Sequence, residues 1–257
     1  MLSRGASGLE EISVARNHLS GSLPAAWSSH RMLSRVDLSD NLVSATLPSQ
    51  WSDLGTLRSA RLFHSHISGT LPHSWSRMRS MESLQLDRNF LSGTLPTEWG
   101  RLPVGNLFLD GAHDHRDEKG PTSTNEISGH IPTEFGQNSN LLSLFAQLRL
   151  SGTLPTQLGA LSRLKGIMVG MNVSGTIPAG LVRHKVDLQA LWLQGILSGT
   201  LPQEMGGAAA PLPQFRSLWA HSHKLSGFLP PELGNARALH SVRLHGNNFS
   251  GTLPTGY

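Results

Sequence analysis

The chain has 257 residues, with 21 Lys and Arg against 17 Asp and Glu, so its formal net charge is +4. This charge is spread along the chain, with no basic run and no nucleic-acid-binding module, and we expect no nucleic-acid partner. There is no cysteine, which excludes disulfides and thiolate metal sites. No signal peptide, anchor or apolar window of about 20 residues is recognisable in this segment.

A phrase close to Leu-Ser-Gly-Thr-Leu-Pro recurs ten times along the chain. Its prolines are Pro24, Pro48, Pro72, Pro96, Pro132, Pro155, Pro178, Pro202, Pro230 and Pro254. The intervals between them are 24, 24, 24, 36, 23, 23, 24, 28 and 24 residues. Such a period with leucines at fixed offsets is typical of a leucine-rich repeat solenoid. We expect one α/β array over residues 1–257, coiled right-handed, with about ten repeats of about 24 residues, a parallel concave sheet and short 3-10 turns on the convex side.

The third full repeat shows the elements that one coil should contain. Leu84 and Leu86 alternate with polar residues, which predicts a short strand with one buried face. Trp75 and Met78, three residues apart, suit a 3-10 or short helical turn. Because a single coil cannot bury its apolar edge, Leu84 should stack on Ala60 of the preceding coil.

An asparagine follows the strand in most repeats, where its amide can satisfy backbone groups that the turn leaves without partners. The predicted ladder consists of Asn17, Asn41, Asn89, Asn125, Asn172 and Asn247. Ser65 and His223 stand in the ladder position of their own repeats. The repeats around Leu148 and Ile196 have no asparagine there, and we expect these two coils to be locally irregular. The glycine of the phrase tolerates a positive φ, but Ala45 replaces it once, which favours packing as its main role.

The residue between the two buried positions of each strand should point away from the core, because side chains alternate faces. Aligning the repeats predicts one outward column: Ser13, Asp37, Arg61, Gln85, Phe108, Phe145, Met168, Trp192, Trp219 and Arg243. The members from Phe108 to Trp219 are large and apolar, and with strands roughly 4.8 Å apart they would form a ridge about 19 Å long. We call Phe108, Phe145, Met168, Trp192 and Trp219 the apolar ridge.

We predict that the apolar ridge binds a partner, with Arg61 and Arg243 contributing from its polar flanks. The alternative is that some of these side chains lie flat on neighbouring coils, or that the alignment slips by one residue in the shorter repeats.

The intervals of 36 and 28 residues place insertions near 111–122 and 206–213. The first contains His113, Asp114 and His115, which could ligate a divalent metal, but a charged insertion is more often a solvated loop. We expect no metal and no cofactor. Both ends of the array stop without the usual polar cap, so we expect the chain to be part of a longer protein.

Nothing in the sequence indicates an enzyme: there is no nucleophile with a base at a recognisable spacing, no phosphate-binding glycine loop and no paired-carboxylate motif. Two glycosylation acceptor motifs begin at Asn172 and Asn248. Because Asn172 is a predicted ladder residue, only Asn248 is kept as a candidate for glycosylation.

The run Asn-x-Leu-Ser-Gly-x-Leu-Pro resembles the plant-type leucine-rich repeat of receptor kinases and polygalacturonase inhibitors. The segments that place Trp27, Trp51, Trp75 and Trp99 three residues after the proline are similar to the repeats of the promastigote surface antigen family of trypanosomatids. The resemblance implies an exported or cell-surface protein that recognises host or environmental ligands.

We therefore expect a non-catalytic module that recognises a protein or a glycan on its concave face, most simply the ectodomain of a cell-surface antigen or adhesion protein. The alternatives are the sensing ectodomain of a receptor kinase, an inhibitor of a secreted hydrolase, and a truncated product of a repeat family. The sequence leaves the ligand and the oligomeric state open.

Overall fold

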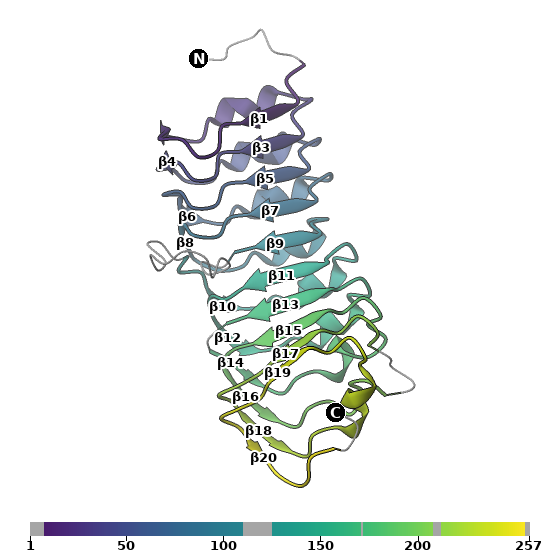
Figure 1. The fold of residues 1–257 in the computed structure, drawn as a ribbon. Coiled ribbons are helices and arrows are strands. Elements are labelled where there is room, and N and C mark those ends of the chain that lie inside the picture. The colour runs from purple at the N-terminus through teal and green to yellow at the C-terminus, as the bar shows by residue number, and fades with distance from the viewer. Residues whose placement is uncertain (1–7, 110–124, 171, 208–211, 255–257) are drawn as a thin grey trace.

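The computed structural model describes residues 8–109, 125–170, 172–207 and 212–254. Successive coils stack along one axis, and each contributes one strand to a long parallel sheet (Figure 1). The first predicted insertion, near 111–122, lies outside the described residues, and so does the middle of the second, near 206–213. No helix among the described residues is long and apolar enough to cross a membrane.

Ten parallel strands form the main sheet, in the order in which they occur in the chain. They are β1 (Glu11–Ser13), β3 (Arg35–Asp37), β5 (Ser59–Arg61), β7 (Ser83–Gln85), β9 (Asn106–Phe108), β11 (Ser143–Ala146), β13 (Gly166–Val169), β15 (Ala190–Leu193), β17 (Ser217–Trp219) and β19 (Ser241–Arg243). Leu84 pairs with Ala60, as the repeat pattern predicts. We call the solvent side of this sheet the sheet face.

The recurring phrase forms a second set of short parallel strands. These strands are β2 (Ser20–Gly21), β4 (Leu42–Val43), β6 (Ser68–Thr70), β8 (Phe90–Ser92), β10 (Ser128–His130), β12 (Arg149–Thr153), β14 (Asn172–Gly175), β16 (Ile196–Gly199), β18 (Lys224–Gly227) and β20 (Asn248–Phe249). The last six even-numbered strands form one sheet, while β2 pairs with β4 and β6 with β8.

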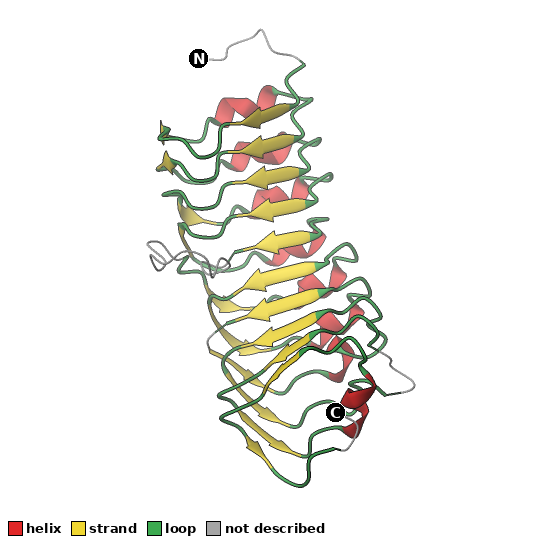
Figure 2. Ribbon diagram, in the orientation of Figure 1, coloured by secondary structure: helices red, strands yellow, loops and turns green. Residues whose placement is uncertain are grey.

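Short 3-10 helices begin just after the proline of the phrase and line the side of the stack away from the main sheet (Figure 2). They are η1 (Ala25–Ser29), η2 (Ser49–Asp53), η3 (His73–Arg77), η4 (Thr97–Arg101), η5 (Thr133–Gln137), η6 (Thr156–Ala160), η7 (Ala179–Leu181) and η8 (Pro231–Asn235). In η3 the amide of Trp75 donates to the carbonyl of Pro72, so the proline both ends the strand segment and starts the turn.

Four tryptophans from η1 to η4 stack in a column inside the N-terminal half. Trp27, Trp51, Trp75 and Trp99 have successive ring centroids 5.8, 6.1 and 6.4 Å apart, with nearly parallel planes. Each indole from Trp51 onward donates to the carbonyl of the proline one coil back, as Trp75 Nε1 does to Pro48 at 2.9 Å. Trp51, Trp75 and Trp99 therefore belong to the core, and the half-buried Trp27 packs against it.

The asparagine ladder forms in the coils that have a long turn after the main-sheet strand. Asn89 is fully buried: its Nδ2 donates to the carbonyls of Leu62 and Leu86, and its Oδ1 accepts from the amide of Ile67. Asn41, Asn125 and Asn247 make the same kinds of bond, while the side chain of Asn17, in the first coil, donates to carbonyls of its own turn. The residue before the ladder position has a positive φ, for example +52° at Arg88.

His223 takes over the ladder role in its coil. Its ring nitrogens lie 3.0 Å from the Leu193 carbonyl and 2.8 Å from the Gly195 carbonyl, and Nδ1 lies 3.3 Å from the amide of Leu197. Ser65, by contrast, is too short to span the same gap. Its hydroxyl is buried without a hydrogen-bond partner among the described residues.

The prediction that Asn172 is a ladder residue is wrong. Asn172 is exposed at the start of β14 and lies opposite Ser151. From the main-sheet strand to the second strand this coil is one residue shorter than the coil of Asn89, and the missing residue moves the asparagine from the buried position to the solvent side.

The coils around Leu148 and Ile196 share this shorter connection, and the expectation that they would be irregular is also wrong. Their strands are longer than those of the first coils, with four residues in β11, five in β12 and four in both β15 and β16. The turn between the two strands is one residue shorter in these coils, and regular strands form on both sides of it without an asparagine.

The glycine of the phrase is required for its positive φ as well as for close packing, which corrects the expectation that packing is its main role. At Gly93 the φ is +83°, and a Cβ there would lie 2.9 Å from Cγ2 of Thr70 in the preceding coil. Ala45, the one replacement, is not among the residues with a positive φ. A side chain at Gly93 would meet both obstacles at once.

Lys185 is buried at a position that apolar residues occupy in other coils. Its ammonium donates to the carbonyls of Gly159 and Leu161, both at 2.6 Å. Burial lowers the pKa of Lys185, because the charged form loses solvation. The two carbonyls satisfy the ammonium inside the coil and tie it to the preceding turn.

Replacing Ser65 by asparagine is expected to stabilise the protein by about 1 kcal/mol, because the new amide can complete the broken ladder. By analogy with Asn89, its Oδ1 would accept from the amide of Val43 and its Nδ2 would donate to the carbonyls of Leu38 and Leu62. Ser65 also lines a hollow of about 290 Å³ between neighbouring turns. Thermal unfolding should show a midpoint higher by about 2–4 °C.

Ser65→Ala is the control, since it removes only a hydroxyl that has no partner, and its melting temperature should stay near that of the wild type. A Ser65→Asn variant that melts below Ser65→Ala would contradict the repair of the ladder.

Candidate recognition surface

The strand pairing of the main sheet places the ten predicted outward residues in one column. Phe108 lies opposite Phe145, Phe145 opposite Met168, Met168 opposite Trp192 and Trp192 opposite Trp219. The same register continues to Arg61 through Gln85 at one end and to Arg243 at the other. The alignment therefore does not slip in the shorter repeats.

The rings of the apolar ridge stack on one another. The ring centroids of Phe108 and Phe145 lie 5.1 Å apart and those of Trp192 and Trp219 lie 5.0 Å apart. Offset-stacked aromatic pairs of this kind stabilise a protein by roughly 0.5–1.5 kcal/mol beyond their burial. None of the five residues is among the strongly exposed apolar side chains, so the ridge is half-buried by its own stacking.

Met168 departs from the predicted ridge, because it is only 8% exposed. The rings of Phe145 and Trp192 come from the strands on either side of β13, yet their centroids are 6.0 Å apart. They therefore converge over the intervening strand and cover Met168. The expectation that Met168 forms part of the exposed ridge is wrong, and packing on neighbouring coils applies to this member.

The C-terminal end of the ridge carries positive charge. The guanidinium of Arg243 lies 4.2 Å from the ring centroid of Trp219, a cation–π contact, and the indole of Trp219 donates to the hydroxyl of Ser241 at 2.9 Å. Two residues beyond the column, His221 and His245 stack with centroids 4.6 Å apart. Burial, together with the nearby His245, His223 and Arg243, lowers the pKa of His221.

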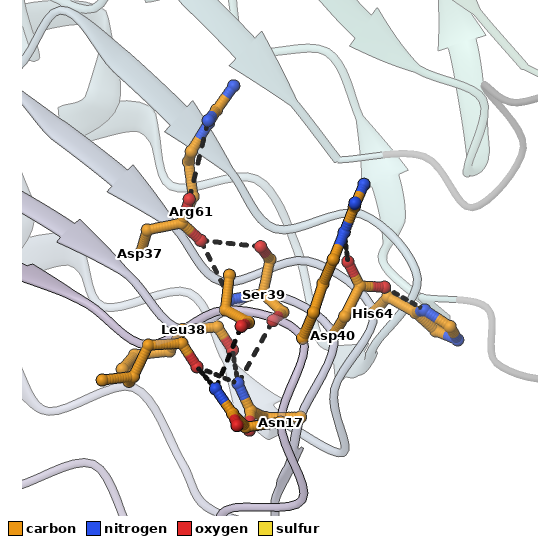
Figure 3. A network of polar contacts seen from close by, with 11 residues as sticks. Asn17, Asp37, Leu38, Ser39, Asp40, Arg61 and His64 are labelled. Atoms are coloured by element: carbon orange, nitrogen blue, oxygen red, sulfur yellow. Dashed lines mark hydrogen bonds and ion pairs between the residues drawn. The ribbon is translucent and has the colours of Figure 1, made fainter.

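The N-terminal end of the column is a network of paired polar groups (Figure 3). Arg61 forms an ion pair with Asp37 at 3.5 Å, and Asp37 accepts hydrogen bonds from the amide and hydroxyl of Ser39. Asp40, in the following turn, lies 2.6 Å from Nδ1 of His64. Arg61 is thus already neutralised, and of the two predicted arginines only Arg243 contacts the ridge.

The ring faces of the ridge are largely occupied. Each stacked pair covers one face of each partner, and Arg243 covers the outer face of Trp219. A sugar binds an aromatic platform through a free ring face, whereas a peptide can pack its side chains against ring edges.

Within the residues that the structure describes, no group of three or more histidines and carboxylates is placed to hold a metal ion. His113, Asp114 and His115 lie outside those residues. The two glycosylation motifs occupy corresponding places in the second set of strands, where Asn172 and Asn248 are both exposed. The reason for setting Asn172 aside no longer holds, and glycosylation at Asn248 remains a prediction.

A scan of protein-family models and a search of curated proteins gave no match. Solved structures do match. A TDR receptor structure superposes on 98% of this chain with a TM-score of 0.86 at 25% identity. The structure of the plant peptide hormone receptor RGFR1 in complex with RGF2 matches 97% of this chain, with a TM-score of 0.76 at 25% identity. The ectodomain of the Arabidopsis receptor kinase HAESA, in complex with an IDA peptide hormone, covers 96% with a TM-score of 0.78 at 26% identity.

The fold is a leucine-rich repeat solenoid. The predicted repeat class, parallel sheet and 3-10 turns are confirmed by these structures and by the strand order. The chain spans 42%, 42% and 43% of the lengths of the three matched chains.

Proposed function

We propose that this solenoid is a peptide- or protein-binding ectodomain whose sheet face, predicted to be the concave one, holds the ligand against the apolar ridge. The observation that carries the proposal is the continuous column from Phe108 to Arg243, in which two stacked aromatic pairs meet at a tilted ring contact and end at an arginine. Aromatic residues and arginine are enriched among the residues that dominate binding energy at protein interfaces.

The structural neighbours support a protein ligand, since two of them were solved with a peptide hormone bound. The sensing ectodomain of a receptor, placed outside the cell, is therefore the form of the proposal that we favour. The interpretation of the chain as a surface antigen rests on the repeats that contain Trp27, Trp51, Trp75 and Trp99. These side chains pack in the core or against it. An inhibitor of a secreted hydrolase would use the same face with a larger partner.

The test is selection of a random peptide library on the immobilised chain, followed by measurement of each enriched peptide against purified variants. The double variant Trp192→Ala with Trp219→Ala should weaken binding by about 30-fold or more, as expected for loss of an interface hot spot. Fluorescence anisotropy gives the affinities, and circular dichroism checks that the variant is folded. A glycan array is probed in parallel.

Phe228→Ala is the matched control, because Phe228 is an aromatic residue 71% exposed that directly follows β18, in the second set of strands and not in the main sheet. It should bind the selected peptides like the wild type. Peptides that bind the double variant as tightly as the wild type would refute a role for the ridge. Specific hits confined to the glycan array would refute a protein ligand.

A further inference from the structure

A hollow of about 490 Å³ opens at the edge of the main sheet, beside the start of β9. Its lining includes Arg58, Arg79 and Arg163 from three different coils and the carboxylate of Glu82. It also includes Asn106, which lies two residues before Phe108 on β9 and so connects the hollow to the apolar ridge. We call it the arginine notch. Its volume is in the range of ligand-binding pockets, roughly 300–1,000 Å³.

The notch exists because one coil is recessed. From Pro96 to Leu107 this coil has one residue fewer than the preceding coil has from Pro72 to Leu84. In the strand register Gly105 stands between Glu82 and Leu142, and it carries no side chain. Its backbone is held by bonds to the carbonyl of Glu82 and the amide of Leu142, so it forms a fixed floor.

The charges in the notch do not cancel. Arg58 is paired with Glu82 at 2.8 Å, and these two residues neutralise each other. Arg79 and Arg163 are exposed and make no hydrogen bond or ion pair with any other described residue. The notch therefore holds two uncompensated guanidinium groups, and guanidinium recognises carboxylates through paired parallel hydrogen bonds.

The spacing of the two arginines fits an extended chain. Arg79 and Arg163 stand three coils apart, which is roughly 14 Å at 4.8 Å per strand. In an extended peptide, residues four positions apart are separated by about 13 Å. Two acidic side chains at that spacing can reach both guanidinium groups when the peptide runs along the solenoid axis.

We propose that the arginine notch binds an acidic segment of the ligand, with carboxylates four residues apart on Arg79 and Arg163. This inference rests on the proposed function only in taking the ligand to be a peptide or protein. The acidic segment lies at the edge of the sheet, while an adjoining part of the same ligand packs against the ridge from Phe108 onward.

The probe is a fluorescein-labelled peptide of ten glutamates, titrated at low salt with each variant and followed by anisotropy. The double variant Arg79→Ala with Arg163→Ala should bind it at least tenfold more weakly than the wild type. The control is the double variant Arg101→Ala with Arg237→Ala, which removes the same charge from exposed arginines outside the notch. Arg237 lies seven residues after Pro230, just as Arg79 lies seven residues after Pro72. This control should lose less than twofold.

Equal losses in the two double variants would overturn the proposal, because binding would then follow net charge alone. A wild type that does not bind the probe would overturn it as well. Thermal unfolding of each variant checks its fold, and Arg79→Lys with Arg163→Lys, which keeps the charge but removes the paired hydrogen bonds, should give an intermediate affinity.

The ridge variant Trp192→Ala with Trp219→Ala separates this inference from the proposed function. It should keep its affinity for the glutamate peptide while losing the peptides selected on the wild type. If selected peptides lack acidic residues and bind the Arg79 and Arg163 double variant normally, the notch proposal fails and the ridge proposal stands.

Discussion

Replacing Trp75 by alanine is expected to destabilise the protein by about 3–5 kcal/mol, the range for removing a fully buried tryptophan. Trp75 is fully buried, stacks on Trp51 and Trp99, and donates to the carbonyl of Pro48. The substitution would leave a cavity between coils. Because each coil contacts mainly its neighbours, the cavity would weaken the coupling between the coils on either side. Urea unfolding followed by circular dichroism should become broader, and hydrogen exchange should show the first three coils opening separately.

Trp27→Ala is the matched control for this effect. Trp27 stands at the end of the column, is half-buried and, among the described residues, stacks on Trp51 alone. Trp27→Ala should lower the free energy of unfolding by less than half as much as Trp75→Ala, and urea unfolding should remain a single cooperative transition. Equal losses for the two variants would mean that the tryptophan column does not act through stacking on both sides.

Replacing Asn89 by alanine should lower the free energy of unfolding by about 3 kcal/mol. The reason is that several buried backbone groups lose their hydrogen-bond partner, at roughly 1–3 kcal/mol each. The carbonyl of Leu62 and the amide of Ile67 are bound by the Asn89 side chain at 2.8 and 3.0 Å across the coil boundary. The measurement is the free energy of unfolding in urea, with hydrogen exchange at Ile67 as a local readout.

Asn17→Ala tests whether the cost comes from bonds between coils. Asn17 is exposed, and its side-chain amide donates to carbonyls of its own turn, at Val14 and Ala15, while its backbone amide, which alanine keeps, donates to Asp40. The expected loss is below 1 kcal/mol, as for an exposed hydrogen bond. A loss as large as that of Asn89→Ala would contradict a stabilising role for the bonds that the ladder makes between coils.

Much of the candidate surface could be predicted from sequence. The period assigns Phe108, Trp192 and Trp219 to one column, because every coil repeats the same strand and the parallel register follows from the repeat. The ring contacts could not be predicted, since the convergence of Phe145 and Trp192 over Met168 depends on side-chain rotamers and on neighbouring strands. The burial of Met168 was missed for that reason.

The arginine notch was missed altogether. Gly105 and the shorter connection before β9 were visible in the sequence as a departure from the period, and attention to the residues before each strand could have found them. The sequence does not show that Arg79 and Arg163 line the same hollow, because they are separated by 84 residues and occupy different positions in their repeats.

The sequence by itself determined the coil, its core positions and the order of strands, because hydrophobic periodicity is a local property repeated in every coil. The tertiary structure alone decided what depends on connection length and on side chains from different coils. One residue fewer in a turn moved Asn172 from the core to solvent, and one residue fewer before a strand opened the arginine notch. Stacking couples each coil to the next, so such single-residue differences acquire their effect only when neighbouring coils are in place.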